Sequence, residues 1–405
     1  MKILVPPFVQ SALRLLRESG FEAYIVGGCV RDSLLRLAPK DWDITTNATP
    51  PEIARVFAAH RIFAKNRRFG TISVLFAPSE SVEITTYRSE SGYTNCRHPD
   101  SVRFVGDIRQ DLKRRDFTIN ALAYEPFSDT LLDDFYGIEH LNARQIVCVG
   151  EPHARFGEDA LRIMRAVRFC ATKGFALQSR TREALLQSLP LLAHISVERK
   201  REELSAMLLG DSVLVLRDYA PVLRAVFGAT WQEPHWNLLA NLSYNLPRAL
   251  PESLALESRL TALLLSSPNP QEILQHLRYN NAQSKRIAQA IAHYPLQSAI
   301  PTLQKALFAL GQDCVQLLAT LGAASGDAAI LPNLALALQG CHNLAMLNLK
   351  GEDVLALGIQ RQHVGAILRD MLSLVIEGRI ANERGALLCA LHDKMCYNTQ
   401  KYEGF

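Results

Sequence analysis

The sequence lacks several features that would fix a structural class at once. It has eight cysteines, but none forms a Cys-x-x-Cys pair, and they are spread through all 405 residues. Buried thiols in a reducing compartment explain this spread better than a disulfide framework or a zinc site. The sequence also has no fixed-period repeat and no low-complexity tract, which argues against a repeat architecture.

A large excess of charge of one sign is absent as well. The 44 Lys and Arg residues are nearly balanced by 40 Asp and Glu residues, which leaves a net charge of +4. This balance permits a nucleic-acid partner, but the surface that binds it then has to be a local patch.

Long apolar runs are missing too. The longest uncharged stretch, residues 328–349, contains proline, asparagine, glutamine and histidine, so no membrane span is expected. The first residues are interrupted by Pro6 and Pro7 and do not resemble a signal peptide. We therefore expect a cytoplasmic enzyme with no membrane association, and no protein partner is evident.

The predicted secondary structure changes along the sequence. A chain of 405 residues predicts two to four domains. Up to about residue 139 short strands and helices alternate, whereas helical periodicity dominates after Leu141. The predicted strands are 23–26, 43–46, 71–76, 82–87 and 121–124, and the predicted helices of the first part are 8–19, 30–37 and one from Pro50 with Thr49 as its N-cap. Residues 89–107 are polar and predict a mobile loop.

The most informative motifs, VGGCVRD and KDWDIT, follow each other near the N-terminus. Gly27 and Gly28 precede a predicted helix, and glycine lets backbone N–H groups approach a phosphate closely. Asp41 and Asp43 lie two residues apart on a predicted extended segment, so both carboxylates can reach one metal ion. Nucleotidyl transfer requires at least a Mg²⁺ ion held beside the bound phosphates. The alternative interpretation of the aspartate pair is a turn or a helix cap.

Two further residues of this part have two interpretations each. Glu83, on a later predicted strand, is either a third acidic neighbour of the metal or an exposed strand residue. Arg31, one turn into the helix after Gly28, either contacts a triphosphate or pairs with Asp32 on the helix surface.

The segment KRRDFTIN at residues 113–120 carries three consecutive cations followed by a carboxylate and an amide. Asp116 and Asn120 are suited to a ribose hydroxyl, which both donates and accepts hydrogen bonds. Arg115 would serve a phosphate. The alternative is an ordinary solvated basic surface.

The segment EDALRIMRAVRF at residues 158–169 predicts one continuous helix. Asp159 and Arg162 lie three residues apart and would share a face of it. A carboxylate and a guanidinium together can meet the Watson–Crick edge of a base, although an intrahelical ion pair is the plainer interpretation. The charged run at residues 199–203 predicts a helix surface, and two smaller basic groups are Lys65, Arg67 and Arg68, and Arg278, Lys285 and Arg286. Any of these could contact RNA phosphate, but ordinary solvated charge is the plainer interpretation of each.

Together these motifs resemble the class II tRNA nucleotidyltransferases, the CCA-adding enzymes, and their relatives the bacterial poly(A) polymerases, within the polymerase-β-like superfamily. Besides the glycine pair and the two aspartates, the similarity includes FGTISV at 69–74, RRDFTINA at 114–121, DFYG at 134–137 and the segment 158–169. It is specific over about residues 20–205 and weaker beyond, where LKGED at 349–353 resembles the C-terminal region of shorter bacterial members.

The resemblance implies roles for individual residues. Asp41 and Asp43 would be the catalytic carboxylates that hold Mg²⁺. The implied nucleotide-binding residues are Gly27, Gly28, Arg31, Arg115, Asp116, Asn120, Asp159, Arg162, Arg165 and Arg168. Among these, Asp159 and Arg162 would select CTP and then ATP in place of a nucleic-acid template.

The resemblance also implies an architecture. An α/β polymerase-β-like head at 1–139 would be followed by an elongated all-α neck at 140–205, a body at 206–325 and an RNA-binding tail at 326–405, with the tRNA acceptor stem along the helices. Residues 89–107 would form the loop that switches from C to A addition. The hinge near Tyr136 departs from the family, which commonly has glycine there, and Gln360-Arg361 replaces a usual Pro-Gly turn.

The implied activity is addition of C, C and A to the 3′ end of tRNA from CTP and ATP, with release of pyrophosphate. A poly(A) polymerase, a CC-adding enzyme or an A-adding enzyme would share the same motifs. The long 89–107 segment and the lack of a basic C-terminal extension favour CCA addition. A catalytically inactive RNA-binding protein is disfavoured because both metal carboxylates are present.

Overall fold

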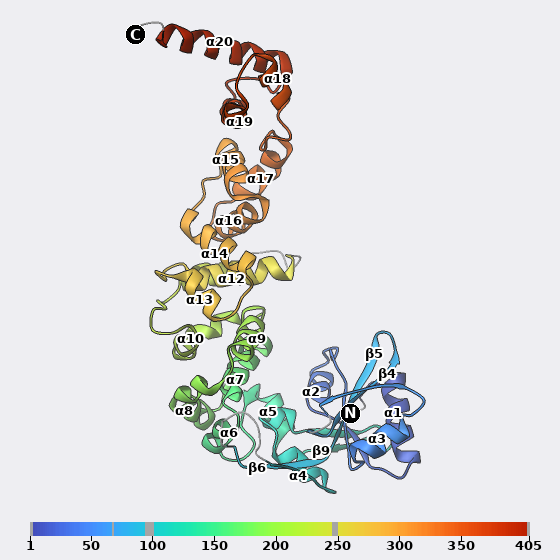
Figure 1. The fold of residues 1–405 in the computed structure, drawn as a ribbon. Helices are drawn as coiled ribbons and strands as arrows, with labels where there is room; N and C mark the ends of the chain where they lie inside the picture. The colour runs from blue at the N-terminus through green and yellow to red at the C-terminus, as the bar shows by residue number, and fades with distance from the viewer. Residues whose placement is uncertain (1–2, 67–68, 94–100, 245–249, 403–405) are drawn as a thin grey trace. The chain divides into compact units, whose positions relative to one another are not determined.

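The computed structural model describes residues 3–66, 69–93, 101–244 and 250–402. The chain divides into two compact units, Met1–Ala229 and Thr230–Phe405. In Figure 1 the first unit runs from blue to green and the second from yellow to red. The predicted boundaries at residues 139 and 205 both lie within the first unit, and the finer four-part division stays a prediction.

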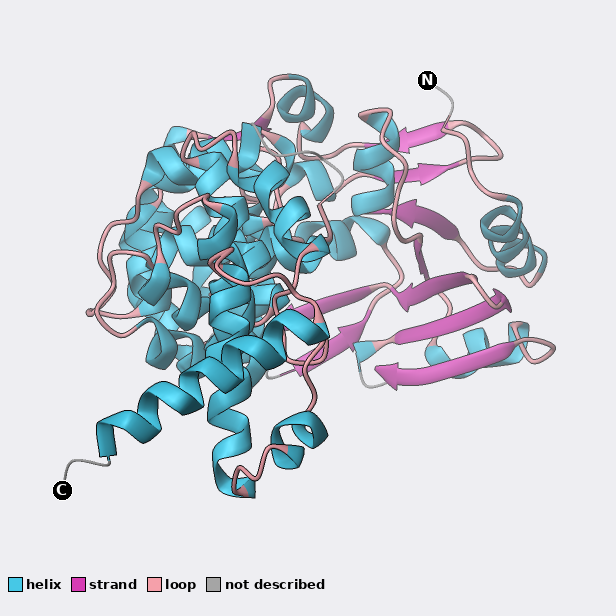
Figure 2. Cartoon of the chain, turned by 90° about the horizontal axis from the view of Figure 1, so that it is seen from above, coloured by secondary structure: helices cyan, strands magenta, loops and turns pink. Residues whose placement is uncertain are grey.

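The first unit contains a seven-stranded mixed sheet in the order β3-β4-β5-β2-β1-β8-β9. Figure 2 shows these strands in magenta among the helices. The strand bounds are β1 Ala23–Val26, β2 Asp43–Thr46, β3 Arg61–Asn66, β4 Thr71–Ala77, β5 Glu80–Thr86, β8 Ala123–Glu125 and β9 Thr130–Leu132. Strand β2 pairs antiparallel with β1 and parallel with β5, which sets Asp43 directly opposite Glu83.

Helices make up most of the rest of the first unit. Their bounds are α1 Pro7–Glu18, α2 Gly28–Leu34, α3 Pro50–Val56, α4 Ile108–Lys113, η2 Thr118–Asn120, α5 Gly137–Asn142, α6 Pro152–Glu158, α7 Leu161–Lys173, α8 Ser179–Gln187, η3 Leu189–His194, α9 Val197–Leu208, η4 Val213–Arg217 and α10 Ala220–Phe227. Helices α1 and α3 pack against the sheet, where Leu13 and Ile53 join Ile25 and Ile44 in one buried core. Burial of such apolar side chains is the main force that holds the sheet and its helices together.

Local sequence signals account for several element ends. Thr49 caps α3 as predicted, and its backbone N–H and hydroxyl both donate to the Glu52 carboxylate, at 2.8 and 2.6 Å. Helix α2 begins at Gly28 and ends at Leu34, earlier than the predicted 30–37. Arg36 adopts the left-handed conformation at φ 59°, which stops a helix from continuing.

The prediction of a loop over residues 89–107 was wrong for the described part of that segment. Strands β6 Arg88–Ser91 and β7 Ser101–Phe104 pair antiparallel as a two-stranded ribbon. A ribbon needs only backbone pairing, so it can form without the alternation of apolar residues that marks a half-buried strand. Residues 94–100, in the middle of the predicted loop, lie outside the described residues.

The prediction of one helix over residues 158–169 was also wrong. Helix α6 ends at Glu158, Asp159 is extended at φ −138° and ψ 105°, and α7 starts at Leu161. The Asp159 carboxylate accepts the Leu161 N–H at 3.0 Å. Aspartate favours such local hydrogen bonds over helix continuation. A short parallel pair, β10 Gln145–Ile146 and β11 Ala176–Leu177, was missed by the helical pattern of this region.

The second unit is built from helices in its described part. Their bounds are α11 Trp236–Tyr244, α12 Glu252–Leu264, α13 Pro270–His276, α14 Asn281–His293, α15 Ile300–Leu310, α16 Gln312–Ala324, α17 Ile330–Gln339, α18 Gly351–Ala356, α19 Arg361–Ile376 and α20 Arg384–Tyr402. One apolar core around Leu303 and Ile330 joins α15, α16 and α17, and a separate one around Met371 and Leu387 joins α18, α19 and α20. Among the described residues, no helix combines the length and apolar character needed to cross a membrane.

Candidate active site

The glycine pair forms a tight turn between β1 and α2. Gly27 has φ +76° and ψ −129°, a conformation that glycine adopts at little cost. A Cβ atom at this position would lie 2.9 Å from the Arg115 Nη1 atom. The backbone angle therefore favours glycine here, and a side chain would also displace the end of the Arg115 guanidinium. The Cys29 thiol, one residue beyond the pair, lies 3.9 Å from the Asp43 carbonyl oxygen, so this turn adjoins the start of β2.

Three carboxylates, which we call the acidic cluster, gather at the start of β2: Asp41, Asp43 and Glu83. The pKa of Asp43 is raised to about 6, chiefly by burial; the charge of Arg115 lowers this pKa, and the charges of Glu83 and Asp41 raise it. Asp41 is exposed and precedes the strand, so the prediction that both aspartates lie on one strand was wrong for Asp41. The charges of Glu83 and Asp41 nevertheless act on Asp43. Among the described residues, no group of three His, Cys, Asp or Glu side chains is placed to hold a metal ion.

A chain of polar side chains runs from α2 to α7. Arg31 donates to the Asn120 side-chain oxygen at 2.6 Å, and Asn120 donates in turn to Asp116 at 3.0 Å. Arg165 closes the chain by donating to the other Asp116 oxygen at 2.8 Å. Burial alone would raise the pKa of Asp116, but Arg165 and the Asn120 hydrogen bond outweigh it and hold that pKa well below its usual range. Four residues predicted from different motifs are thus brought together.

The Arg31 side chain forms the ion pair with Asp32 that one of its two interpretations predicts, and its contact with a triphosphate stays a prediction. Besides Asn120, it donates to Asp32 at 2.9 Å, and Asp32 also receives Lys173 of α7 at 2.9 Å. A surface pair between Arg31 and Asp32 therefore exists, but it belongs to a larger set of charges that joins α2 to α7.

Arg115 is held by a residue that the sequence reasoning missed. Asp111 is fully buried on α4 and receives Arg114 at 2.7 Å and Arg115 at 3.3 Å. The buried Arg115 Nε atom has no hydrogen-bond partner among the described residues. In sequence, only the spacing of Asp111 three and four residues before two arginines hinted at this arrangement.

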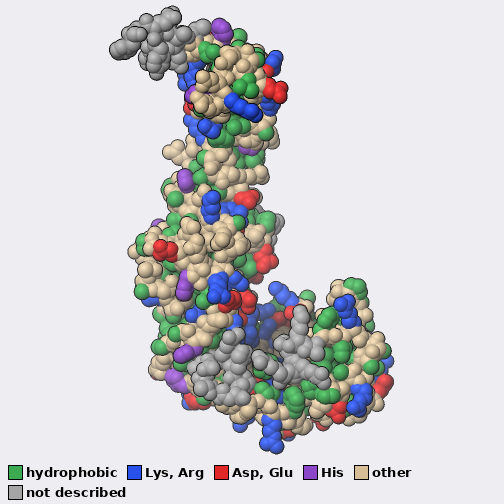
Figure 3. Space-filling model, in the orientation of Figure 1, with side chains coloured by type: hydrophobic (Ala, Val, Ile, Leu, Met, Phe, Trp, Pro, Cys, Tyr) green, Lys and Arg blue, Asp and Glu red, His purple; other side chains and the backbone are tan. Residues whose placement is uncertain are grey.

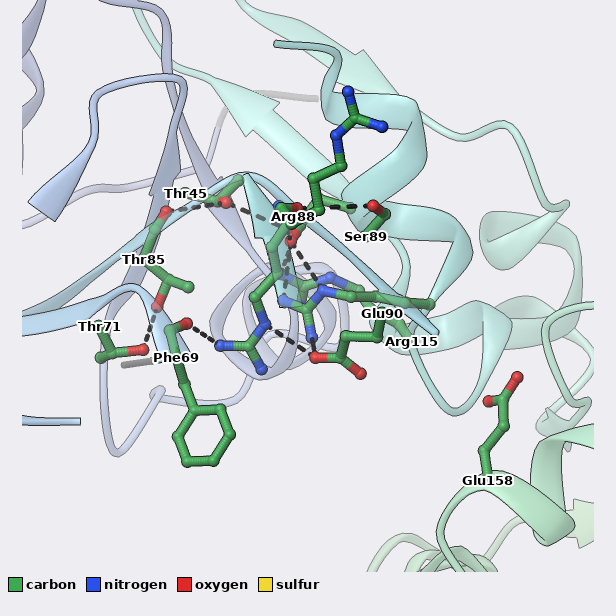
Figure 4. Close-up of polar contacts among 12 residues, drawn as sticks. Thr45, Phe69, Thr71, Thr85, Arg88, Ser89, Glu90, Arg115 and Glu158 are labelled. Atoms are coloured by element: carbon green, nitrogen blue, oxygen red, sulfur yellow. Dashed lines mark hydrogen bonds and ion pairs between the residues drawn. The ribbon is translucent and has the colours of Figure 1, made fainter. Parts of the chain in front are cut away.

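The ribbon contributes a second ion-pair network beside Arg115. The Glu90 carboxylate forms ion pairs with Arg88 at 2.8 Å and with Arg114 at 3.1 Å. Arg88 also donates a hydrogen bond to the Phe69 carbonyl oxygen. Figure 4 shows Arg88 reaching both of these acceptors, with Arg115 close to Glu90. The ribbon is therefore tied to α4 by charged hydrogen bonds, which are about twice as strong as neutral ones.

The Arg162 backbone N–H donates to the Asp159 carbonyl oxygen at 3.0 Å, but in the described structure the two side chains bond to other partners. The carboxylate of Asp159 receives Arg199 at 3.0 Å. The guanidinium of Arg162 donates to Glu158 at 2.5 Å and to the carbonyl oxygens of Arg155 and Arg114, both at 3.0 Å. Arg162 is 8% exposed. The prediction of a shared helix face was wrong because the helix breaks at Asp159.

The charged run at residues 199–203 does not form the solvated surface predicted for it. Arg199 pairs with Asp159, and Glu203 receives Arg168 at 2.6 Å. Both contacts place helix α9 against the start and middle of α7. A sequence pattern of mixed charges carries no signal that distinguishes such a facing surface from an exposed one.

The predicted hinge is a strained turn. Tyr136 adopts φ 62° and ψ 30°, where only glycine is free of strain. The next residue, Gly137, has no room for a side chain, since its Cβ atom would lie 2.5 Å from the Thr118 carbonyl oxygen. The Asp133 carboxylate accepts the Gly137 and Ile138 N–H groups at 2.6 and 2.9 Å, which fixes the start of α5.

The smaller basic groups are described only in part. The structure does not describe Arg67 and Arg68, nor the side chain of Lys65. Arg286 is not a free cation, because it donates to both carboxylate oxygens of Glu257 at 2.7 Å. On the face drawn in Figure 3, the Lys and Arg side chains of the second unit are scattered in several places with acidic ones among them.

The mixed sheet, its glycine turn and the adjoining acidic cluster define a polymerase-β-like nucleotidyltransferase head followed by a helical remainder. The profile described as "Poly A polymerase head domain" matches residues 23–147, and "Probable RNA and SrmB- binding site of polymerase A" matches residues 174–216. A CCA-adding enzyme of Lactobacillus delbrueckii subsp. bulgaricus is 36% identical over 386 residues, which are 93% of this chain and 94% of that one. This chain therefore belongs to the family of CCA-adding enzymes.

Solved structures agree with this assignment. The Bacillus stearothermophilus CCA-adding enzyme in complex with CTP has a TM-score of 0.78 and 27% identity, and the similarity covers 98% of this chain and 100% of that one. The Thermotoga maritima CCA-adding enzyme complexed with tRNA shares the fold at a TM-score of 0.71 and 23% identity, over 96% of both chains. The predicted fold class and nucleotidyltransferase family are thus confirmed.

Proposed function

We propose that this chain adds C, C and A to the 3′ end of tRNA, using CTP and ATP and releasing pyrophosphate, without a nucleic-acid template. The observation that carries the proposal is the similarity to CCA-adding enzymes along almost the whole chain, combined with an intact pair of aspartates beside the glycine turn. The cytoplasm is the expected compartment because tRNA and both nucleotides are available there.

The two aspartates, Asp41 and Asp43, are the proposed ligands of a divalent cation. Burial and two neighbouring carboxylates keep the pKa of Asp43 high, and a bound cation would relieve that repulsion. Mg²⁺ is usually held by one or two carboxylates together with substrate phosphates, so Asp41 and Asp43 would be its ligands, with Glu83 beside them. Bound there, Mg²⁺ would neutralise developing charge and activate the attacking hydroxyl.

The remaining residues would bind and orient the nucleotide. The backbone of Gly27 and Gly28 and the side chains of Arg31 and Arg115 would receive the phosphates, since all four border the turn before α2. Asp116 and Asn120 would meet the ribose. Arg165 and Arg168 of α7 would add positive charge beside them.

Asp159 and Arg162 would select the base, and to do so each would exchange a present hydrogen-bond partner for the base. Arg162 donates to Glu158 and to two backbone carbonyls, while Asp159 accepts from Arg199. Both side chains therefore have to release at least one of these bonds before they can meet a base. The four-part division into head, neck, body and tail would place the tRNA acceptor stem along the helices that follow α7.

The test is incorporation of labelled CTP and ATP into tRNA transcripts that lack the last one, two or three nucleotides. A CCA-adding enzyme extends all three to CCA and stops. A poly(A) polymerase continues with ATP and ignores CTP, whereas a CC-adding or A-adding enzyme completes only its part. Asp41→Ala and Asp43→Ala serve as catalytic-site variants, and both are expected to abolish incorporation while nucleotide binding partly remains. Glu80→Ala, at the exposed far end of β5, is the matched control.

A further inference from the structure

Three arginines surround one buried phenylalanine ring between α2 and α7. The Phe169 ring is 3% exposed. The guanidinium carbon of Arg168 lies 4.6 Å from the ring centroid, that of Arg31 lies 5.0 Å from it, and that of Arg165 lies 5.6 Å from it. A guanidinium within about 6 Å of an aromatic centroid is attracted by the negative face of the ring.

Each of these arginines also has a polar partner at close range. The partners are Asn120 and Asp32 for Arg31, Asp116 for Arg165, and Glu203 for Arg168. The partners come from different elements, because Asn120 lies on η2 and Glu203 on α9. What the three arginines share is the Phe169 ring.

Like charges this close repel one another, and burial strengthens that repulsion. The carboxylate partners neutralise part of the charge, but each of Asp32, Asp116 and Glu203 pairs with a different one of the three arginines. The ring is a neutral group that attracts all three guanidinium groups at once. The ring thereby limits how far the three guanidinium groups move apart while no triphosphate is bound.

We propose that Phe169 is a positioning residue for nucleotide binding. Its ring keeps the guanidinium groups of Arg31, Arg165 and Arg168 in the arrangement that receives the triphosphate, and it joins α2 to α7 in doing so. This inference rests on the proposed function, since it takes those three arginines as nucleotide-binding residues.

The experiment replaces Phe169 alone, in the full chain, with 4-fluoro-, 3,5-difluoro- and 3,4,5-trifluorophenylalanine. Fluorination weakens the attraction of the ring for cations but nearly preserves its shape. The dissociation constant for CTP, measured by calorimetry, is expected to rise stepwise along the series, by about five- to tenfold in total. The constant for cytidine, which has no phosphate, should stay the same.

The matched control is Phe117, which is also buried and packs edge-on against Phe169 with centroids 5.8 Å apart. The same series at Phe117 should leave CTP affinity unchanged. Equal CTP affinity along the Phe169 series, with unchanged melting temperature, would overturn the proposal. So would equal losses at both positions.

A second variant keeps the inference testable if a fluorinated protein folds poorly. Phe169→Leu retains apolar bulk without an aromatic face and should raise the KM for CTP more than it lowers kcat, while Phe169→Tyr should restore the KM. A Phe169→Leu variant that melts normally and keeps its KM contradicts the proposal. Failure of the wild-type chain to extend tRNA would instead reject the proposed function, because the CTP binding series does not depend on transfer.

Discussion

Asp43 and Glu83 stand opposite each other in the parallel register of β2 and β5. Because these two strands are hydrogen-bonded neighbours, the backbone positions of the two residues are held side by side, although each side chain can still rotate. Burial and the charge of Glu83 outweigh Arg115 and keep the pKa of Asp43 at about 6. The chain thus holds a carboxylate that resists ionisation at the site proposed for the cation.

Asp43→Asn should stabilise the protein near neutral pH when divalent cations are removed. The unfolded chain releases the Asp43 proton near pH 4, whereas the folded protein retains it up to about pH 6. The folded state binds more protons between these values, so the wild-type loses stability as pH rises through this window. The asparagine variant should gain about 2 kcal/mol at pH 7 and nothing below pH 4. Urea unfolding in chelator measures this, and equal stabilities at pH 7 would contradict it.

Glu83→Gln should lower the pKa of Asp43, because it removes a neighbouring negative charge. Carbon-13 NMR titration of the aspartate carboxyl groups in metal-free protein reports the change directly. The control is Glu80→Gln on the same strand, whose side chain is exposed and is not among the charges that act on Asp43. A titration curve that is the same in both variants would remove Glu83 from the acidic cluster.

Arg162→Ala should affect both base choice and stability. The variant loses three hydrogen bonds in a buried position and leaves Glu158 with less compensation, so we expect a loss of about 2 kcal/mol. Misincorporation of UTP or GTP should rise more than the KM for triphosphate does. Arg180→Ala is a suitable control because its ion pair with Glu151 is exposed. Unchanged fidelity in a folded Arg162→Ala protein would remove this residue from base selection.

Tyr136→Gly should stabilise the first unit. Tyr136 occupies a left-handed conformation that costs a residue with a Cβ atom about 1 kcal/mol or more. Its side chain is 70% exposed, so little packing is lost with it. Thermal unfolding should show a gain of about 0.5–1 kcal/mol for glycine. Tyr136→Ala, which keeps the Cβ atom, should show no such gain, and a gain of equal size in both variants would point to the aromatic ring instead.

The sequence predicted those parts of the fold that depend on short-range signals. Strands β1 and β2 begin and end where their apolar and β-branched runs do, and Thr49 caps α3 as its spacing from Glu52 indicates. The fold class followed from a resemblance in motifs. By contrast, the break at Asp159 depends on one side-chain hydrogen bond competing with a helix of otherwise good propensity.

The sequence predicted which residues belong to the candidate site, but not which hydrogen bonds join them. Arg31, Asp116, Asn120 and Arg165 come from three separate motifs, and the structure joins them through Asp116. The partners of these residues across the chain could not be predicted, because Asp111 and Glu203 have no local pattern that separates a buried ion pair from a surface one. Phe169 was similarly hidden, since an aromatic residue at helical spacing predicts only core packing.

The strongly lowered pKa of Asp116 has a consequence for kinetics. Its carboxylate keeps its charge throughout the range of pH in which such an enzyme would be assayed, so the links among Arg31, Asn120 and Arg165 do not titrate there. Any loss of rate as the pH falls from 7 to 5 then has to originate elsewhere, and the proposed metal ligand Asp43, with a pKa of about 6 in the metal-free protein, is a group that titrates in that interval.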